Sequence, residues 1–140
     1  MVKIFLDTNI LLDYLIDERP GNPDGKQIIK LLVSGEFEGY VSPISLINIF
    51  YSLRSQRTEQ ERKDIIESFM DILNIIEIDF DIMQLALYVP IADYEDGLQY
   101  IYAQKASVDY IITGDVKFRE YDLELKRVSA ADFIRQSPSD

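Results

Sequence analysis

The sequence predicts an α/β fold: a three-layer α/β/α sandwich with a central, mostly parallel sheet. Short apolar runs of strand length alternate along the 140 residues with longer segments whose apolar side chains recur at helical spacing. Alternation of strands and helices is typical of parallel sheets, because each helix carries the chain back across the sheet. Such a sheet is covered by helices on both faces.

The first half of the chain shows this alternation clearly. Residues 2–6 form a largely apolar run, and residues 7–16 place Ile10, Leu11 and Leu15 on one helical stripe. The two prolines and two glycines that follow predict a loop. In chain order we expect a strand at 2–6, a helix at 7–16, a loop at 17–25, a helix at 27–33, a strand at 39–41 and a helix from 42–43 to about 53.

Two signals mark helix starts further along. Pro43 suits the first turn of a helix. Thr58 and Glu61 have the spacing of a capping box, in which each side chain bonds to the backbone of the other residue. We expect the remaining elements to be a helix from 58 to about 73, a strand at 75–78, helices at 80–88 and 94–106, a strand at 109–113, a short strand near 126–128 and a helix at 130–135.

Composition narrows the class of protein. A hydrophobic share of 47% fits one domain with a full core, which we place at residues 1–135, followed by a polar tail at 136–140. The absence of cysteine removes any disulfide framework. Charge appears too early for a signal peptide, and no apolar stretch approaches the roughly 20 residues of a membrane span. These features predict a cytoplasmic protein without a membrane partner.

Three aspartates occupy equivalent places in the expected fold. Asp7 ends the first strand, Asp115 follows the strand at 109–113, and Asp96 lies at the start of the helix that leads into that strand. In a parallel α/β sheet these positions all lie at the carboxyl edge. Carboxylates gathered there resist ionising together unless a cation lies between them. The sequence therefore predicts a divalent metal site.

The residue types that are missing limit the chemistry. Histidine and cysteine are both absent, which excludes the usual zinc and copper ligands and any imidazole base. Oxygen ligands alone favour Mg²⁺ or Mn²⁺. The net charge of −11 argues against a simple nucleic-acid-binding face, yet Arg54 and Arg57 lie in a local basic cluster. That cluster is either an RNA-binding patch or a solvated helix corner.

The motifs around these residues resemble those of PIN-domain ribonucleases, including the VapC-type toxins of bacterial toxin–antitoxin pairs. The resemblance rests on four segments in the expected order and covers almost the whole chain. They are VKIFLDTNILLD at 2–13, DYEDGLQY at 93–100 with Ala103, DYIITGD at 109–115 and VSAADFI at 128–134.

The resemblance implies a metal-dependent endoribonuclease that cleaves single-stranded RNA. Asp7, Asp96 and Asp115 are then the catalytic metal ligands, and the dication activates water for attack on the phosphodiester. The resemblance further implies supporting roles for Thr8, Asn9, Thr113, Asp93 and Asn48, and an antitoxin protein as partner. The helix at 44–53 is apolar on more than one side, which predicts a homodimer contact.

Two departures from the family pattern keep an alternative open. The family usually has a glutamate where this chain has Asn48, and Gly114 and Lys117 alter its fourth motif. An amide carries no negative charge, so metal affinity is expected to fall. The alternative function is a catalytically weakened interaction or RNA-binding module. A phosphotransferase of the haloacid-dehalogenase type is disfavoured, because Asn9 stands where its second aspartate belongs.

Each acidic residue also has a purely structural interpretation. Asp7 is suited to cap the first helix. Asp93 and Asp96 fit the N-cap and third positions of theirs, where negative charge complements the helix dipole. Asp115 suits a turn after Gly114. Only their positions in space distinguish these interpretations from a metal site.

Overall fold

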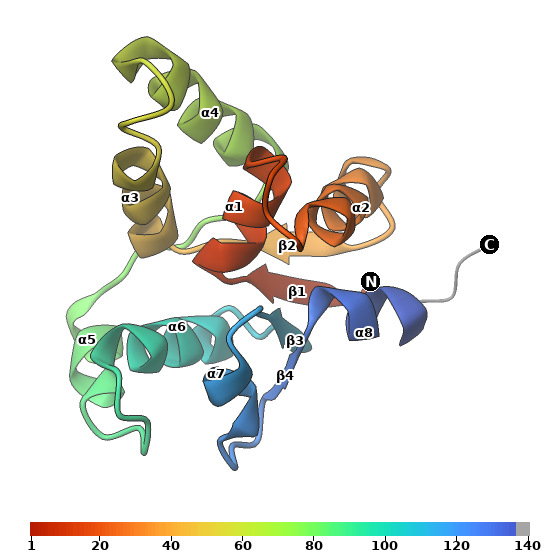
Figure 1. The fold of residues 1–140 in the computed structure, drawn as a ribbon. Helices are drawn as coiled ribbons and strands as arrows, with labels where there is room; N and C mark the ends of the chain where they lie inside the picture. Colours follow the sequence, from red (N-terminus) through yellow and green to blue (C-terminus); the bar gives the residue numbers. More distant parts are fainter. Residues whose placement is uncertain (137–140) are drawn as a thin grey trace.

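The computed structural model describes residues 1–136, which form one four-stranded sheet between two layers of helices (Figure 1). The strands lie in the order β2 (Glu38–Tyr40), β1 (Lys3–Leu6), β3 (Tyr110–Ile112) and β4 (Lys126–Val128). Each neighbouring pair is parallel. The predicted α/β/α class is therefore confirmed, with a sheet that is parallel throughout rather than mostly parallel.

Alternation along the central strands divides the core into two parts. Ile4 and Leu6 of β1 point into one hydrophobic cluster, whereas Phe5 points into the other. In the neighbouring β3, Ile111 pairs with Phe5 and shares its cluster, and Ile112 pairs with Leu6. All five side chains are fully buried. Because successive strand residues face opposite sides, this sheet needs helices on both faces.

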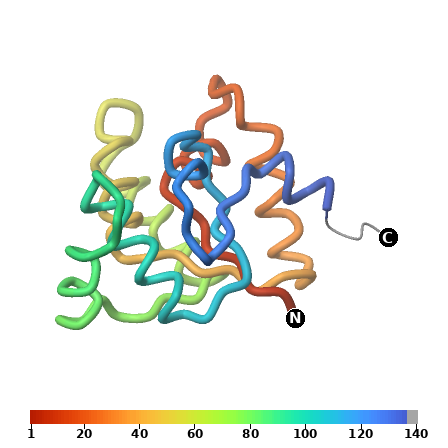
Figure 2. Tube along the Cα trace, turned by 90° about the horizontal axis from the view of Figure 1, so that it is seen from below, coloured from red at the N-terminus to blue at the C-terminus, as the bar shows by residue number. Residues whose placement is uncertain are grey.

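The helices divide accordingly. One face of the sheet packs against α1 (Thr8–Leu15), α2 (Asn22–Val33), α3 (Pro43–Ser52), α4 (Glu59–Ile72) and α8 (Ala130–Gln136). The other packs against α5 (Phe80–Ala86), α6 (Tyr94–Lys105) and α7 (Val116–Glu120). Figure 2 shows the N-terminus and α8 on the side of the molecule away from α3 and α5. No helix within residues 1–136 is long and apolar enough to cross a membrane.

The strand predicted at 75–78 is wrong. Pairing beside β2 stops at a single bridge between Tyr40 and Asn74. The hydroxyl of Tyr102, from α6, accepts from the Ile76 N–H at 2.6 Å and donates to the Ile76 carbonyl at 2.7 Å. The backbone N–H of residue 76 is therefore not available to a strand partner, because it already bonds to this side chain.

The loop predicted at 17–25 is partly wrong as well, because α2 begins at Asn22. Pro23 lies in its first turn, where a missing N–H costs nothing. Gly25 faces α1, and a Cβ there would come within 2.8 Å of the Tyr14 nitrogen. The residues that suggested a loop instead start a helix and let two helices approach closely. The short helix α7 was not predicted, and the predicted tail lies outside the described residues except for Gln136, which ends α8.

Candidate metal and active site

The three predicted aspartates lie at the carboxyl edge of the sheet. Asp7 directly follows β1, and Asp115 follows β3 at the N-cap of α7. Asp96 lies in the first turn of α6, on the opposite side of the sheet from α1. The negative charges of Asp7 and Asp115 both raise the pKa of Asp96, which places the three carboxylates in one electrostatic field.

Asp7 is both a helix cap and a buried acid. One carboxylate oxygen accepts from the Thr8 backbone N–H at 2.9 Å, and the other accepts from the Thr113 hydroxyl at 2.8 Å. The side chain of Asn9 also donates to it at 3.3 Å. Asp7 is only 6% exposed, and burial raises its pKa although these hydrogen bonds oppose the rise. Asp7 is therefore the N-cap of α1, as its structural interpretation predicted. Capping alone does not explain why this carboxyl group is buried.

Thr113 and Asn9 tie the first strand to the loop that carries Asp115. The Thr113 hydroxyl accepts a hydrogen bond from the Asp115 N–H at 3.1 Å and donates one to the Asp7 carboxylate. The side-chain oxygen Oδ1 of Asn9 accepts from the Gly114 N–H at 2.8 Å. A Cβ at Gly114 would lie 3.3 Å from that oxygen, so glycine suits this close approach. Two of the predicted supporting residues therefore orient the acids.

A buried polar network missed by the sequence analysis continues from this site. Gln99 of α6 donates to the Ser45 hydroxyl at 2.8 Å and to Asp7 at 3.4 Å. The Ser42 hydroxyl donates to the Gln99 carbonyl oxygen at 2.6 Å. The Thr8 hydroxyl donates to the Ser45 hydroxyl at 2.8 Å, and the Thr8 backbone N–H donates to Asp7. One signal was available in the sequence: Gln99 lies three residues after Asp96, within a run of largely apolar residues.

Asp93 and Asp96 occupy the predicted positions at the start of α6. Asp93 is the N-cap and accepts from the Asp96 N–H at 3.0 Å. Burial is the main factor that raises the pKa of Asp96 to about 7, and the charges of Asp7, Asp93, Asp115 and Glu95 add to it. A carboxyl group with such a pKa is half protonated at neutral pH, because its surroundings disfavour a further negative charge. A cation bound at this edge would favour the ionised form.

The raised pKa predicts how stability depends on pH. Folded Asp96 holds its proton up to about pH 7, whereas the unfolded chain releases it near the ordinary value of 3.8. Since the folded state binds more protons in this window, its stability is lost as the pH rises from about 4 through 7. In chelator, Tm should fall by a few degrees between about pH 5 and pH 8, and Asp96→Asn should flatten the fall. An equal fall in both proteins would contradict the assignment.

Within residues 1–136, the remaining predicted residues form hydrogen bonds with groups other than the three aspartates. Asn48, on α3, donates to the Glu95 carboxylate at 3.1 Å. Arg54 and Arg57 lie exposed where α3 leads towards α4 and donate to the backbone carbonyls of Tyr51 and Leu15.

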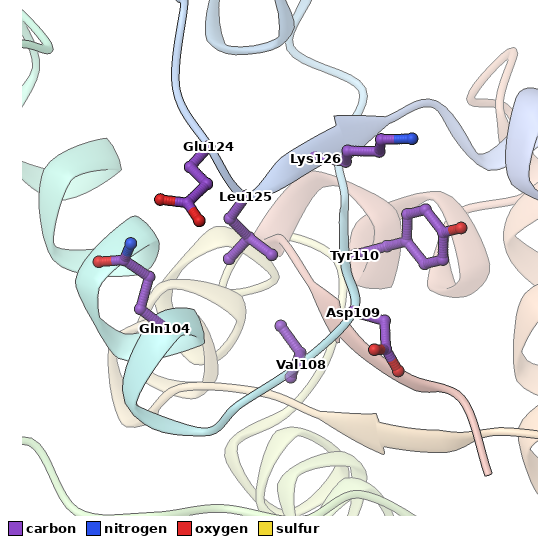
Figure 3. A pocket seen from close by; sticks show the side chains of 7 residues that line it. All are labelled: Gln104, Val108, Asp109, Tyr110, Glu124, Leu125 and Lys126. Atoms are coloured by element: carbon purple, nitrogen blue, oxygen red, sulfur yellow. The ribbon is translucent and has the colours of Figure 1, made fainter.

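Two cavities mark opposite edges of the sheet. One of about 410 Å³ adjoins the candidate site and is lined by Asn9, Asp115, Arg19 and Arg119 among others. A larger one of about 530 Å³ lies at the amino ends of β3 and β4 (Figure 3). Ligands of parallel α/β sheets bind outside the carboxyl ends of the strands. The smaller cavity therefore lies at the edge where a ligand is expected, and Asp115 is the one of the three aspartates that lines it.

The chemistry of the donors fits a hard dication. They are carboxylate oxygens supported by amide and hydroxyl groups, the ligand types preferred by Mg²⁺ and Mn²⁺. Within residues 1–136, no three acidic side chains are already gathered closely enough to hold an ion. The electrostatic coupling of the aspartates shows instead that their charges oppose one another, and a cation would relieve that opposition.

A parallel α/β/α fold with aspartates at the carboxyl edge defines a class of candidate metal-dependent enzymes. Within that class, residues 3–117 match the family described as PIN domain. The chain belongs to the PIN-domain family, which confirms the resemblance drawn from its motifs.

Individual relatives agree with this assignment. The chain is 24% identical over 131 residues to Ribonuclease VapC1 of Aquifex aeolicus, covering 88% of each protein. The structure of VapBC2 from Rickettsia felis bound to a promoter DNA fragment superposes with a TM-score of 0.68 at 16% identity, covering 90% of this chain and 97% of that one. A toxin–antitoxin complex from Klebsiella pneumoniae gives 0.65 at 22% identity, covering 84% and 90%.

Proposed function

We propose that this protein is a metal-dependent endoribonuclease that cleaves single-stranded RNA and acts in the cytoplasm as the toxin of a toxin–antitoxin pair. The proposal is carried by two observations: Asp7, Asp96 and Asp115 all lie at the carboxyl edge of a PIN-domain sheet, and the charges of Asp7 and Asp115 raise the pKa of Asp96. Ribonuclease VapC1, its relative over most of the chain, supports the reaction class. Chelator-sensitive cleavage of RNA by the purified protein, lost in Asp7→Asn, is the direct test.

The carboxylates of Asp7, Asp96 and Asp115 would hold Mg²⁺ or Mn²⁺. A bound dication would stabilise the negative charge that develops as the phosphodiester is cleaved. The protein contributes a fixed orientation, because Thr113 and Asn9 hold Asp7 and the Thr113 oxygen also holds the Asp115 backbone. Without a bound cation the Asp96 carboxyl has a pKa of about 7, so binding Mg²⁺ or Mn²⁺ near neutral pH would release its proton.

The RNA backbone is proposed to approach along the cavity beside Asp115. Arg19 and Arg119 line this cavity, whereas Arg54 and Arg57 do not. Arg19 is partly exposed and pairs with Asp13 at 2.7 Å, and Arg119 donates to the Thr113 carbonyl at 2.8 Å. Guanidinium groups are well suited to phosphate oxygens. Neither arginine was predicted from the sequence, because each lies outside the basic cluster that holds Arg54 and Arg57.

The two arginine pairs can be compared directly. Arg19→Gln should raise KM for RNA about fivefold with kcat nearly unchanged, because one exposed charge contact is worth about 1 kcal/mol. The salt dependence of binding should also weaken. Arg57→Gln, the same change just before α4, should leave KM unaltered. The reverse pattern would move the RNA path to the Arg54 and Arg57 corner.

Two protein partners belong to the proposal. The Klebsiella pneumoniae toxin–antitoxin complex shares this fold, which supports an antitoxin as one of them. For the homodimer, α3 exposes Ile47 and Tyr51, 58% and 59% accessible, while its other face packs into the core through Ile49 and Leu53. An exposed apolar surface of this kind favours contact with a second copy.

A further inference from the structure

Glu95 occupies an unusual place at the rim of the candidate site. It is the second residue of α6, next to Asp96, and its side chain is exposed. Instead of extending into solvent, its carboxylate accepts from the Asn48 amide at 3.1 Å. Asn48 belongs to α3, on the other side of the sheet. The hydrogen bond therefore joins the two helical layers across the edge at which the aspartates meet.

This contact is poorly explained as a stabilising one. Ordering a long, exposed glutamate side chain costs rotamer freedom, and an exposed polar contact returns little stability. Negative charge near the start of α6 suits the helix dipole, but Asp93 and Asp96 already provide it. A third carboxylate in this turn adds repulsion, and the negative charge of Glu95 is felt at both Asp7 and Asp96.

The geometry points to Glu95 as a fourth carboxylate of the metal site, held in position by the Asn48 amide. This inference rests on the function proposed above. Asn48 is suited to the task because its amide donates a proton, whereas a carboxylate at position 48 would repel Glu95. The uncharged amide of Asn48 thus holds the negative charge of Glu95 at the site. Glu95 is the proposed ligand, and Asn48 is a positioning residue.

The test measures Mn²⁺ binding to the full chain by calorimetry, with RNA cleavage as a second readout. Glu95→Gln should weaken Mn²⁺ binding about 100-fold while Tm in chelator stays the same or rises, because repulsion is relieved. Asn48→Ala should weaken binding about tenfold, the scale of losing a residue that orients a ligand. The matched control is Glu67→Gln, the same change at an exposed position on α4, which should bind Mn²⁺ like the wild type.

Combining the changes separates ligand from positioning residue. If Asn48 acts only through Glu95, Asn48→Ala should have no further effect on Mn²⁺ affinity in Glu95→Gln protein. Additive losses would overturn the positioning role. Wild-type affinity in Glu95→Gln, alongside loss in Asp7→Asn, would overturn Glu95 as a ligand and leave the nuclease proposal intact. A wild type that binds Mn²⁺ no better than Asp7→Asn would overturn both.

Discussion

Purified wild-type protein, free of any bound partner, is expected to cleave single-stranded RNA in Mn²⁺, and Asp7→Asn or Asp96→Asn is each expected to reduce the rate by about 10²–10³-fold or more. Both changes keep nearly the same shape while removing one negative charge. Asparagine at position 7 still caps α1, and the Thr113 hydroxyl can turn to accept from the new amide. The losses should therefore reflect chemistry and not unfolding.

The double variant provides an internal check. Ligands of one ion act as a unit, so Asp7→Asn combined with Asp96→Asn should cost scarcely more than either change alone. The control variant Glu67→Gln, changed at an exposed position of α4, should cleave RNA like the wild type. Chelator should abolish cleavage by the wild type and by this control. Equal cleavage by wild type and Asp7→Asn would reveal a contaminant, and the interaction-module alternative would then replace the nuclease.

The second large effect concerns thermal stability. Mn²⁺ or Mg²⁺ at about one hundred times its Kd should stabilise the folded protein by about 2.7 kcal/mol, or roughly 10 °C in Tm for a chain of this size. Asp7→Asn should remove this response. In chelator the same variant should melt above the wild type, because an uncharged side chain replaces a buried carboxylate whose pKa is raised by burial.

Asp7→Ala distinguishes the charge of this residue from its role as a cap. Asp7→Ala loses both the charge and the cap. In chelator it should therefore be less stable than Asp7→Asn by the cost of a missing cap, about 1 kcal/mol, and should have the lower Tm. Scanning calorimetry in chelator and in Mn²⁺ measures both variants. An equal rise in Tm on adding Mn²⁺ to wild type and Asp7→Asn would place the ion elsewhere on this chain of net charge −11.

Chain direction explains how the sequence alone predicted that three aspartates lie at one edge of the sheet. Once residues 2–6 and 109–113 are assigned to parallel strands, Asp7 and Asp115 must lie at the same edge, and Asp96 must start its helix there. The caps of α4 and α6 were equally predictable. Thr58 and Asp93 bond within their own turns, so local sequence alone specifies those contacts.

Contacts between distant residues were beyond the sequence. The Asn48–Glu95 bond spans 47 positions, and the Gln99–Ser45 bond spans 54. In the segment at 75–78, where a strand was predicted, the backbone of Ile76 bonds instead to Tyr102, 26 residues away.

The sequence by itself determined the alternation of strands and helices, the two-faced core and the edge at which three aspartates meet, because these follow from periodicity and chain direction. Only the tertiary structure decided that Gln99 reaches Asp7 and that Asn48 holds Glu95. The physical reason is that α3 and α6 lie on opposite faces of the sheet. Which of their polar side chains meet depends on how both helices pack against β1, and no local pattern records that packing.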